Sequence, residues 1–199
     1  MQVILIRHGK TPGNALLRYN GRTDEPLSAE GIAQLKQMGA DPCVGQVFVT
    51  PLQRTQQTAE ILFPNAEQII VDDLREMDFG DFEGRSYLDM ENDAAYRAWV
   101  DSGSLAPCPN GEGRYEFCRR VCAAFETVIC RAAEAGKQTV TFVVHGGTIM
   151  AIMERYAQPA GEFYSYRLKN AQGYRCDVIF DGQANVAALE NRTVWEGNL

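Results

Sequence analysis

Short apolar runs alternate along the chain with segments in which apolar residues recur every three or four positions. Uninterrupted apolar runs are typical of buried parallel strands, and the longer spacing is typical of helices that bury one face. The runs predict strands at residues 2–6, 46–50, 68–71 and 139–144, and the segments predict helices at 28–39, 51–62, 112–135 and 148–157. Residues 176–180 and 185–189 predict a hairpin turned by Asp181-Gly182. This alternation predicts an α/β fold, a three-layer α/β/α sandwich around a mostly parallel central sheet.

The segment 77–111 interrupts this alternation. Glycine and proline punctuate it, and a short helix is predicted at 93–100. A long insertion of this kind is more often a functional lid than a linker, so we expect a single domain, residues 1–199, with a small lid. Aromatic residues of the lid either stack on a substrate ring or pack the lid, and packing is favoured; they are Tyr87, Tyr96 and Trp99. No element is assigned to the last ten residues.

Composition and charge narrow the class of protein. The chain has 199 residues, of which 45% are hydrophobic and 23% charged, so it is expected to bury a full core. Its net charge of −7 argues against nucleic acid and against an acidic membrane surface as partners. It contains neither an apolar stretch of membrane-spanning length nor a recognisable secretory signal, so a cytoplasmic location is expected. An anionic small molecule remains possible as substrate, because a few arginines can oppose the overall charge locally.

Cysteine usage points to packing and not to metal binding. The chain has six cysteines and two histidines, and the spacing of a zinc site is absent from the sequence. Cys118 and Cys122 lie four apart in an apolar helical stripe, where cysteine behaves as a small hydrophobic residue. We therefore expect reduced core thiols, and no metal or cofactor.

Both histidines, His8 and His145, follow a predicted strand and precede a glycine. Open α/β sheets bind ligands at the carboxyl ends of their strands, so the two imidazoles are expected to meet in one cleft. The alternative, two unrelated loop histidines, is less favoured because both occur in the same setting. Arg7 adjoins His8, and Arg54 begins a helix after a strand. Alone, Arg54 suggests a surface salt bridge, but beside these residues a phosphate site is preferred, because guanidinium binds phosphate oxygens in a fork.

Four ordered motifs resemble those of the histidine phosphatase superfamily, the group that contains the phosphoglycerate mutases. They are Leu5-Ile6-Arg7-His8-Gly9-Lys10-Thr11-Pro12-Gly13-Asn14, the arginine block from Thr50 to Ala59, the acid loop from Leu74 to Gly84, and Val144-His145-Gly146-Gly147-Thr148. Gly21, Asp24, Pro26, Leu27 and Gly31 match a further block. The similarity covers nearly the whole chain and implies a phosphoglycerate mutase-like fold.

The resemblance implies a metal-independent mechanism with named roles. His8 is the nucleophile and forms a phosphohistidine, and Glu76 is the general acid. Asp78 and Glu83 are rival acids, which only the motif register disfavours. Apolar neighbours are expected to raise the pKa of Glu76; these are Phe79 and Phe82. The groups that hold phosphate oxygens are Arg7, Arg54 and His145, with Asn14 as a neutral donor. Further substrate contacts are implied for Gly9, Gly21, Thr23 and Gly146.

The chain departs from the family pattern at three positions. Lys10 replaces a usual glutamate or glutamine, and either adds a charge beside the pocket or points to solvent. Thr50 replaces a serine and keeps the hydroxyl. Gly113 falls where the family often has a serine after Gly111-Glu112, which puts a substrate contact from that hydroxyl in doubt.

Three functions are weighed. The first is a phosphomonoesterase for a small phosphorylated metabolite, because the lid is short and residues 19–28 resemble those of the α-ribazole phosphatase group. The second is a phosphoglycerate mutase, which the short lid disfavours. The third is a catalytically idle module that binds a phosphorylated ligand; it is disfavoured because the residues of the implied active site are all present. The oligomeric state cannot be read from the sequence.

Overall fold

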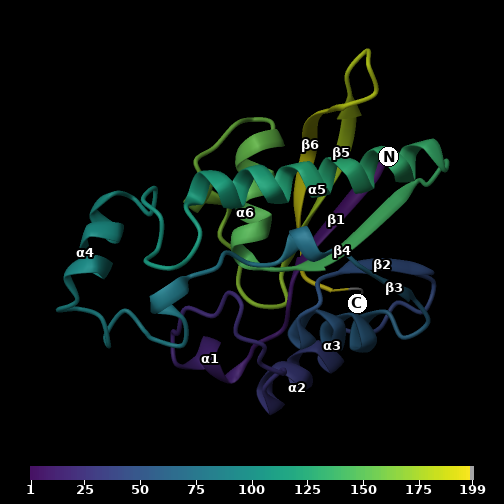
Figure 1. The fold of residues 1–199 in the computed structure, drawn as a ribbon. Coiled ribbons are helices and arrows are strands. Elements are labelled where there is room, and N and C mark those ends of the chain that lie inside the picture. The colour runs from purple at the N-terminus through teal and green to yellow at the C-terminus, as the bar shows by residue number, and fades with distance from the viewer. Residues whose placement is uncertain (198–199) are drawn as a thin grey trace.

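The computed structural model describes residues 1–197, and a twisted sheet of six strands runs through the centre of this part of the chain (Figure 1). The strand order is β3-β2-β4-β1-β5-β6. Four neighbouring strands are parallel, namely β3 (Glu67–Ile70), β2 (Gln46–Val49), β4 (Thr139–Val144) and β1 (Gln2–Arg7). The antiparallel pair is β5 (Gly173–Phe180) and β6 (Val186–Trp195). The mostly parallel sheet agrees with the prediction.

Helices cover both faces of the sheet. On one face lie α2 (Ala29–Gln37) and α3 (Gln53–Leu62), and on the other lie α5 (Arg114–Glu134) and α6 (Gly146–Tyr156) (Figure 1). Each face has its own apolar core: Phe125 and Phe142 belong to the core under α5 and α6, and Leu35 and Val47 to the other. The predicted three-layer sandwich is therefore confirmed. Among the helices of residues 1–197, none combines the length and the apolar character needed to span a bilayer.

Several element boundaries differ from those predicted. Helix α3 begins at Gln53, not at residue 51, because the Thr55 hydroxyl donates to the carbonyl oxygens of Thr50 and Leu52 and holds the chain in a turn there. Helix α6 begins two residues earlier than predicted, with His145 as its N-cap. Strand β6 continues into the unassigned C-terminal residues as far as Trp195, whose side chain is buried in the core with α2 and α3. Residues 198 and 199 lie outside the described part.

The predicted lid carries a short helix, α4 (Ala94–Asp101), which lies well away from the sheet (Figure 1). Tyr96 and Trp99 of α4 are buried and pack against Tyr19 and Phe82, as the packing interpretation predicts. Tyr87 is exposed instead. The remaining short helices are α1 (Pro12–Ala15) and three single turns at Asp72–Leu74, Gly80–Phe82 and Phe163–Tyr166.

The cysteines are all free thiols. Cys108 and Cys176 are buried, and Cys118 and Cys122 of α5 pack against the core, in agreement with the prediction of core thiols. Cys43 is exposed, so the prediction is wrong for that residue.

Candidate active site

The two histidines meet at the carboxyl ends of neighbouring strands. Strands β1 and β4 are parallel and in register, with Arg7 opposite Val144, so the residue after each strand emerges at the same edge. The His8 backbone N–H donates to the Val144 carbonyl at 3.0 Å. The two imidazole rings then lie edge to face, with centroids 5.3 Å apart.

His8 has the geometry of a nitrogen nucleophile. Its Nδ1 lies 2.7 Å from the carbonyl oxygen of Gly9, which can only accept, so Nδ1 carries the proton and Nε2 keeps its lone pair. Burial lowers the pKa of His8 well below its ordinary value, and the charges of Arg54 and Arg7 lower it further. The ring is therefore neutral near pH 7, and Nε2 is the free nucleophilic atom.

His145 is held from both sides by protein groups. Its Nδ1 accepts a hydrogen bond from Arg54 Nε at 3.3 Å, and its Nε2 lies 3.0 Å from the Thr50 hydroxyl oxygen. Nε2 therefore carries the proton and donates to the Thr50 hydroxyl. A serine, the residue usual at this position in the family, would supply the same hydroxyl. Burial and the Arg54 charge lower the pKa of His145 well below its ordinary value. Both ring nitrogens are thus engaged in this conformation.

Arg54 is buried, and the loop before α2 accepts its hydrogen bonds. Its Nη1 donates to the Thr23 carbonyl at 2.7 Å, and its Nη2 donates to the carbonyl oxygens of Gly21 at 2.8 Å and Asn20 at 3.3 Å. Burial lowers the pKa of Arg54 from its ordinary value, against the opposing charge of Glu76. The surface salt bridge is therefore excluded as the role of Arg54, and the side chain lies beside the two histidines.

Gly21 and Thr23, for which the family resemblance implies substrate contacts, bind a carboxylate of the protein in this structure. Both backbone N–H groups donate to the Glu83 carboxylate, at 2.9 and 3.2 Å, and the Thr23 hydroxyl donates to it at 2.6 Å. Gly21 is needed for close packing, because a Cβ there would lie 1.7 Å from the Met77 carbonyl oxygen. A Cβ on Gly9 would likewise meet the side chain of Leu35, and the Gly9 N–H donates to the Thr58 hydroxyl at 2.9 Å. These residues hold Arg54 and His8 in place.

Glu76 is the carboxyl group that faces the histidine site. Its Oε2 accepts from the Gly147 N–H at 2.9 Å and its Oε1 from the Met77 N–H at 3.0 Å. Burial raises the pKa of Glu76, although these two N–H groups and the arginines act in the opposite direction. The rivals are engaged elsewhere: Glu83 binds the loop before α2, and Asp78 pairs with Arg22 at 3.0 Å.

A cavity of about 540 Å³ opens beside His8 and Glu76. It is also lined by Arg7, Asn14 and Gly146, the first residue of α6. Arg7 donates from Nη1 to the Leu168 carbonyl at 2.6 Å, and its buried Nε has no partner within the described residues. The N-terminus of a helix attracts anions. These groups of the lining therefore suit a phosphoryl group.

The lining of the cavity is rich in aromatic and arginine side chains. Its aromatic residues are Tyr19, Phe79, Tyr96, Trp99, Phe117, Phe163 and Tyr164, and its arginines besides Arg7 are Arg18, Arg114 and Arg167. Arg54, His145, Gly9, Gly21 and Thr23 do not line it. Lys10 is also absent from the lining and pairs with Glu30 at 2.8 Å, in agreement with the solvent-facing alternative.

Two asparagines were not predicted from the sequence. Asn170, which precedes β5, donates from Nδ2 to the His8 carbonyl at 3.2 Å and to Asn14 Oδ1 at 3.0 Å. Asn14 Oδ1 also accepts from the Thr11 N–H, so the NH₂ end of this amide is left for the cavity that Asn14 lines. Asn20 lines the cavity, and both polar atoms of its amide are buried without a partner among the described residues. Nothing in the sequence separates Asn170 from other loop asparagines, whereas Asn20 adjoins the recognised Gly21.

Comparisons with known proteins agree with this geometry. The family model for the histidine phosphatase superfamily (branch 1) matches residues 3–191. An adenosylcobalamin/α-ribazole phosphatase from Salmonella typhimurium is 31% identical, over 98% of both chains. The crystal structure of the α-ribazole phosphatase from Shigella flexneri is similar with a TM-score of 0.76 and 28% identity, over 95% of each chain. A phosphoglycerate mutase from Thermus thermophilus gives a TM-score of 0.66 and 27% identity, over 95% of this chain and 98% of that one.

Proposed function

The chain belongs to the histidine phosphatase superfamily and is a phosphatase, and we propose that it hydrolyses α-ribazole phosphate through a phosphohistidine on His8. The observation that carries this proposal is one cavity that is lined both by His8 and Glu76 and by aromatic side chains. α-Ribazole phosphate has the matching shape, a phosphomonoester joined through a sugar to an aromatic base.

In the first step, His8 Nε2 attacks phosphorus, and the bond from phosphorus to the leaving oxygen breaks. Glu76 gives its proton to that oxygen, and burial favours this role because it raises the pKa of the carboxyl group. The neutral state of His8 makes this attack possible without prior loss of a proton. The products of the step are the free alcohol and the phosphohistidine.

In the second step, a water molecule attacks the phosphohistidine. The Glu76 carboxylate accepts a proton from this water, and the bond from phosphorus to Nε2 breaks. Inorganic phosphate leaves, and both side chains return to their starting states. The two steps account for every bond and proton of the hydrolysis without a cofactor.

Phosphoryl transfer depends mainly on positioning and on stabilising the charge of the transferred group. We assign this work to the buried Nε of Arg7, the NH₂ of Asn14 and the N-terminus of α6 at Gly146. Arg54 supplies further positive charge from beside the histidines and holds His145 through its Nδ1. His145 in turn packs edge to face on His8 and fixes the orientation of the nucleophilic ring.

A substrate panel tests the proposal. The kcat/KM of the purified protein is measured with α-ribazole 5′-phosphate, a sugar phosphate, a purine nucleoside monophosphate and 3-phosphoglycerate, with release of phosphate as the readout. The proposal predicts the highest kcat/KM for α-ribazole 5′-phosphate. A higher value for another monoester would overturn the substrate assignment, and isomerisation of 3-phosphoglycerate would make the protein a mutase.

A further inference from the structure

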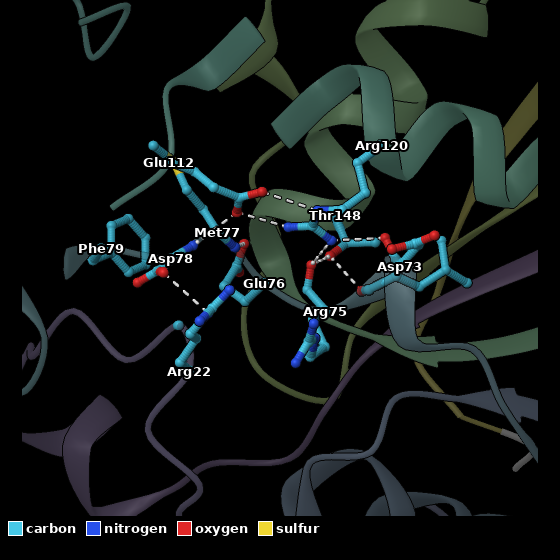
Figure 2. A network of polar contacts seen from close by, with 12 residues as sticks. Arg22, Asp73, Arg75, Glu76, Met77, Asp78, Phe79, Glu112, Arg120 and Thr148 are labelled. Carbon is cyan, nitrogen blue, oxygen red and sulfur yellow. Dashed lines mark hydrogen bonds and ion pairs between the residues drawn. The ribbon is translucent and has the colours of Figure 1, made fainter. Parts of the chain in front are cut away.

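A bidentate ion pair lies against the loop that carries Glu76 (Figure 2). Arg120, on the second turn of α5, donates from Nε to Glu112 Oε1 at 2.9 Å and from Nη2 to Glu112 Oε2 at 2.7 Å. Its remaining nitrogen, Nη1, donates to the carbonyl oxygens of Asp73 at 2.7 Å and Arg75 at 3.2 Å. One guanidinium thus joins the carboxylate to the backbone just before Glu76.

The same carboxylate reaches the backbone just after Glu76. Glu112 Oε2 accepts a hydrogen bond from the Asp78 N–H at 3.0 Å, and the Glu112 N–H donates to the Asp78 carbonyl at 2.9 Å. The Asp78 side chain is in turn paired with Arg22 (Figure 2). Asp78 is therefore fixed at its N–H, its carbonyl and its carboxylate.

We propose that Arg120 and Glu112 are positioning residues for the general acid. The pair, named here the acid-loop clamp, holds the backbone at residues 73, 75 and 78, on both sides of Glu76. Fixing these peptides directs the Glu76 carboxyl toward the Gly147 N–H, where it faces the cavity. Neither Arg120 nor Glu112 lines the cavity, although the Arg120 guanidinium lies over the ring of Phe117, which does, at 5.4 Å from its centroid. The hydrogen bonds of the clamp go to the loop that carries Glu76. This inference rests on the proposed function, because it presupposes Glu76 as the acid.

An ordinary surface salt bridge does not account for these contacts. Exposed ion pairs leave their side chains mobile and screened by solvent. Here the side chains of Arg120 and Glu112 are 20% and 22% exposed, and the pair has the fork geometry that fixes both groups. Arg120 also donates from a separate nitrogen to two backbone carbonyls, and an ion pair alone does not require these contacts. These contacts fix the backbone of the loop that carries Glu76.

The test uses the dependence of the rate on the leaving group. A general acid matters most when the leaving alcohol is a strong base, so a displaced Glu76 lowers kcat/KM for an alkyl phosphate far more than for p-nitrophenyl phosphate. kcat/KM is the correct quantity, because it reports the phosphorylation of His8 and not the later hydrolysis. For Arg120→Met we expect kcat/KM to fall by about 10-fold or more with glycerol 3-phosphate and by less than about 3-fold with p-nitrophenyl phosphate. The expected fall with glycerol 3-phosphate is a fraction of the full effect of a general acid.

Arg119→Met is the matched control, since Arg119 is the neighbouring residue of α5 and is exposed. A second pair of variants covers the case in which Arg120→Met does not fold. These are Glu112→Gln, which removes the bidentate contact, and Glu116→Gln, on the first turn of α5, as its exposed control. We expect the leaving-group effect in Glu112→Gln and its absence in both controls.

Glu76→Gln separates failure of this inference from failure of the proposed function. If Glu76→Gln shows the leaving-group effect and a folded clamp variant does not, the clamp is overturned and the general acid stands. If Glu76→Gln itself lacks the effect, the acid assignment fails, and the clamp fails with it. Equal losses for both substrates in Arg120→Met and Glu112→Gln would likewise overturn the clamp, because they would indicate a structural role only.

Discussion

Glu76 and Gly147 are in contact through both oxygens of the carboxyl group. The Gly147 N–H donates to Oε2 at 2.9 Å, and a Cβ placed on Gly147 would lie 2.2 Å from Oε1. The first turn of α6 therefore both orients the acid and leaves room for it, and the room exists only because residue 147 has no side chain. The acid loop and the second histidine motif, far apart in the sequence, form one unit here.

Gly147→Ala is expected to displace Glu76 and to reduce kcat/KM for an alkyl phosphate by about 10²-fold or more, the lower range for loss of a general acid. The backbone at this residue is helical, so the protein should remain folded. Gly45→Ala is the matched control, because a Cβ there meets nothing within 4 Å. Kinetics and thermal melts of the two variants check this, and an unchanged kcat/KM in Gly147→Ala would contradict the position assigned to Glu76.

The activity is expected to lack an acid limb near pH 6.5. His8 attacks in its neutral form, and because burial lowers its pKa, it stays neutral as the pH falls below the ordinary value of 6.5. Glu76 acts in its protonated form, and because burial raises its pKa above 4.5, activity declines as the pH rises through that raised value. A profile of kcat/KM from about pH 4 to pH 9 tests both expectations, the absence of a decline below pH 6.5 from His8 and the decline with rising pH from Glu76. A rate that rises with pH through 6.5 would show that His8 titrates normally.

Arg54→Lys is expected to reduce activity strongly. A lysine cannot reproduce the fork that binds two loop carbonyls and His145 together. We expect a rise of the barrier of about 3–4 kcal/mol, by analogy with loss of one oxyanion donor. Arg97→Lys, on the exposed part of α4, serves as the control, and steady-state kinetics is the measurement. Retention of more than a tenth of the activity would contradict the role of Arg54.

Tyr164→Leu is expected to raise KM for α-ribazole phosphate and to leave KM for glycerol 3-phosphate nearly unchanged. Tyr164 lines the cavity and is 41% exposed, so it is available to a ring of the substrate. Loss of one aromatic contact of about 1 kcal/mol corresponds to roughly a fivefold rise in KM. A matched rise for both substrates would place Tyr164 in lid packing and not in recognition.

The sequence pattern predicts the layers of the fold well, because each layer follows from local apolar spacing. The meeting of His8 and His145 is also predictable, since both follow buried strands and the ends of parallel strands share an edge. The ends of helices and strands are less predictable where they depend on side-chain contacts. The start of α3 depends on the Thr55 hydroxyl, and the length of β6 depends on burial of Trp195 against elements from the other end of the chain.

The parts of the site that escape prediction depend on partners distant in sequence. The resemblance implies substrate contacts for Gly21 and Thr23, but in the structure their backbone N–H groups donate to Glu83, about sixty residues later. Asn170 reaches the His8 carbonyl across 162 positions, and no local pattern marks it. Short motifs therefore indicate which residues gather at the site, and the tertiary contacts decide which of them face the cavity.

The central claim is that His8 is the nucleophile in a reaction that needs no metal. The most direct test is hydrolysis of p-nitrophenyl phosphate by the wild type and by His8→Ala, both in the presence of a chelator, after thermal melts show that both are folded. The account predicts that the wild type remains active and that His8→Ala loses essentially all activity. Activity that survives in His8→Ala, or that vanishes from the wild type when the chelator is added, would contradict the account.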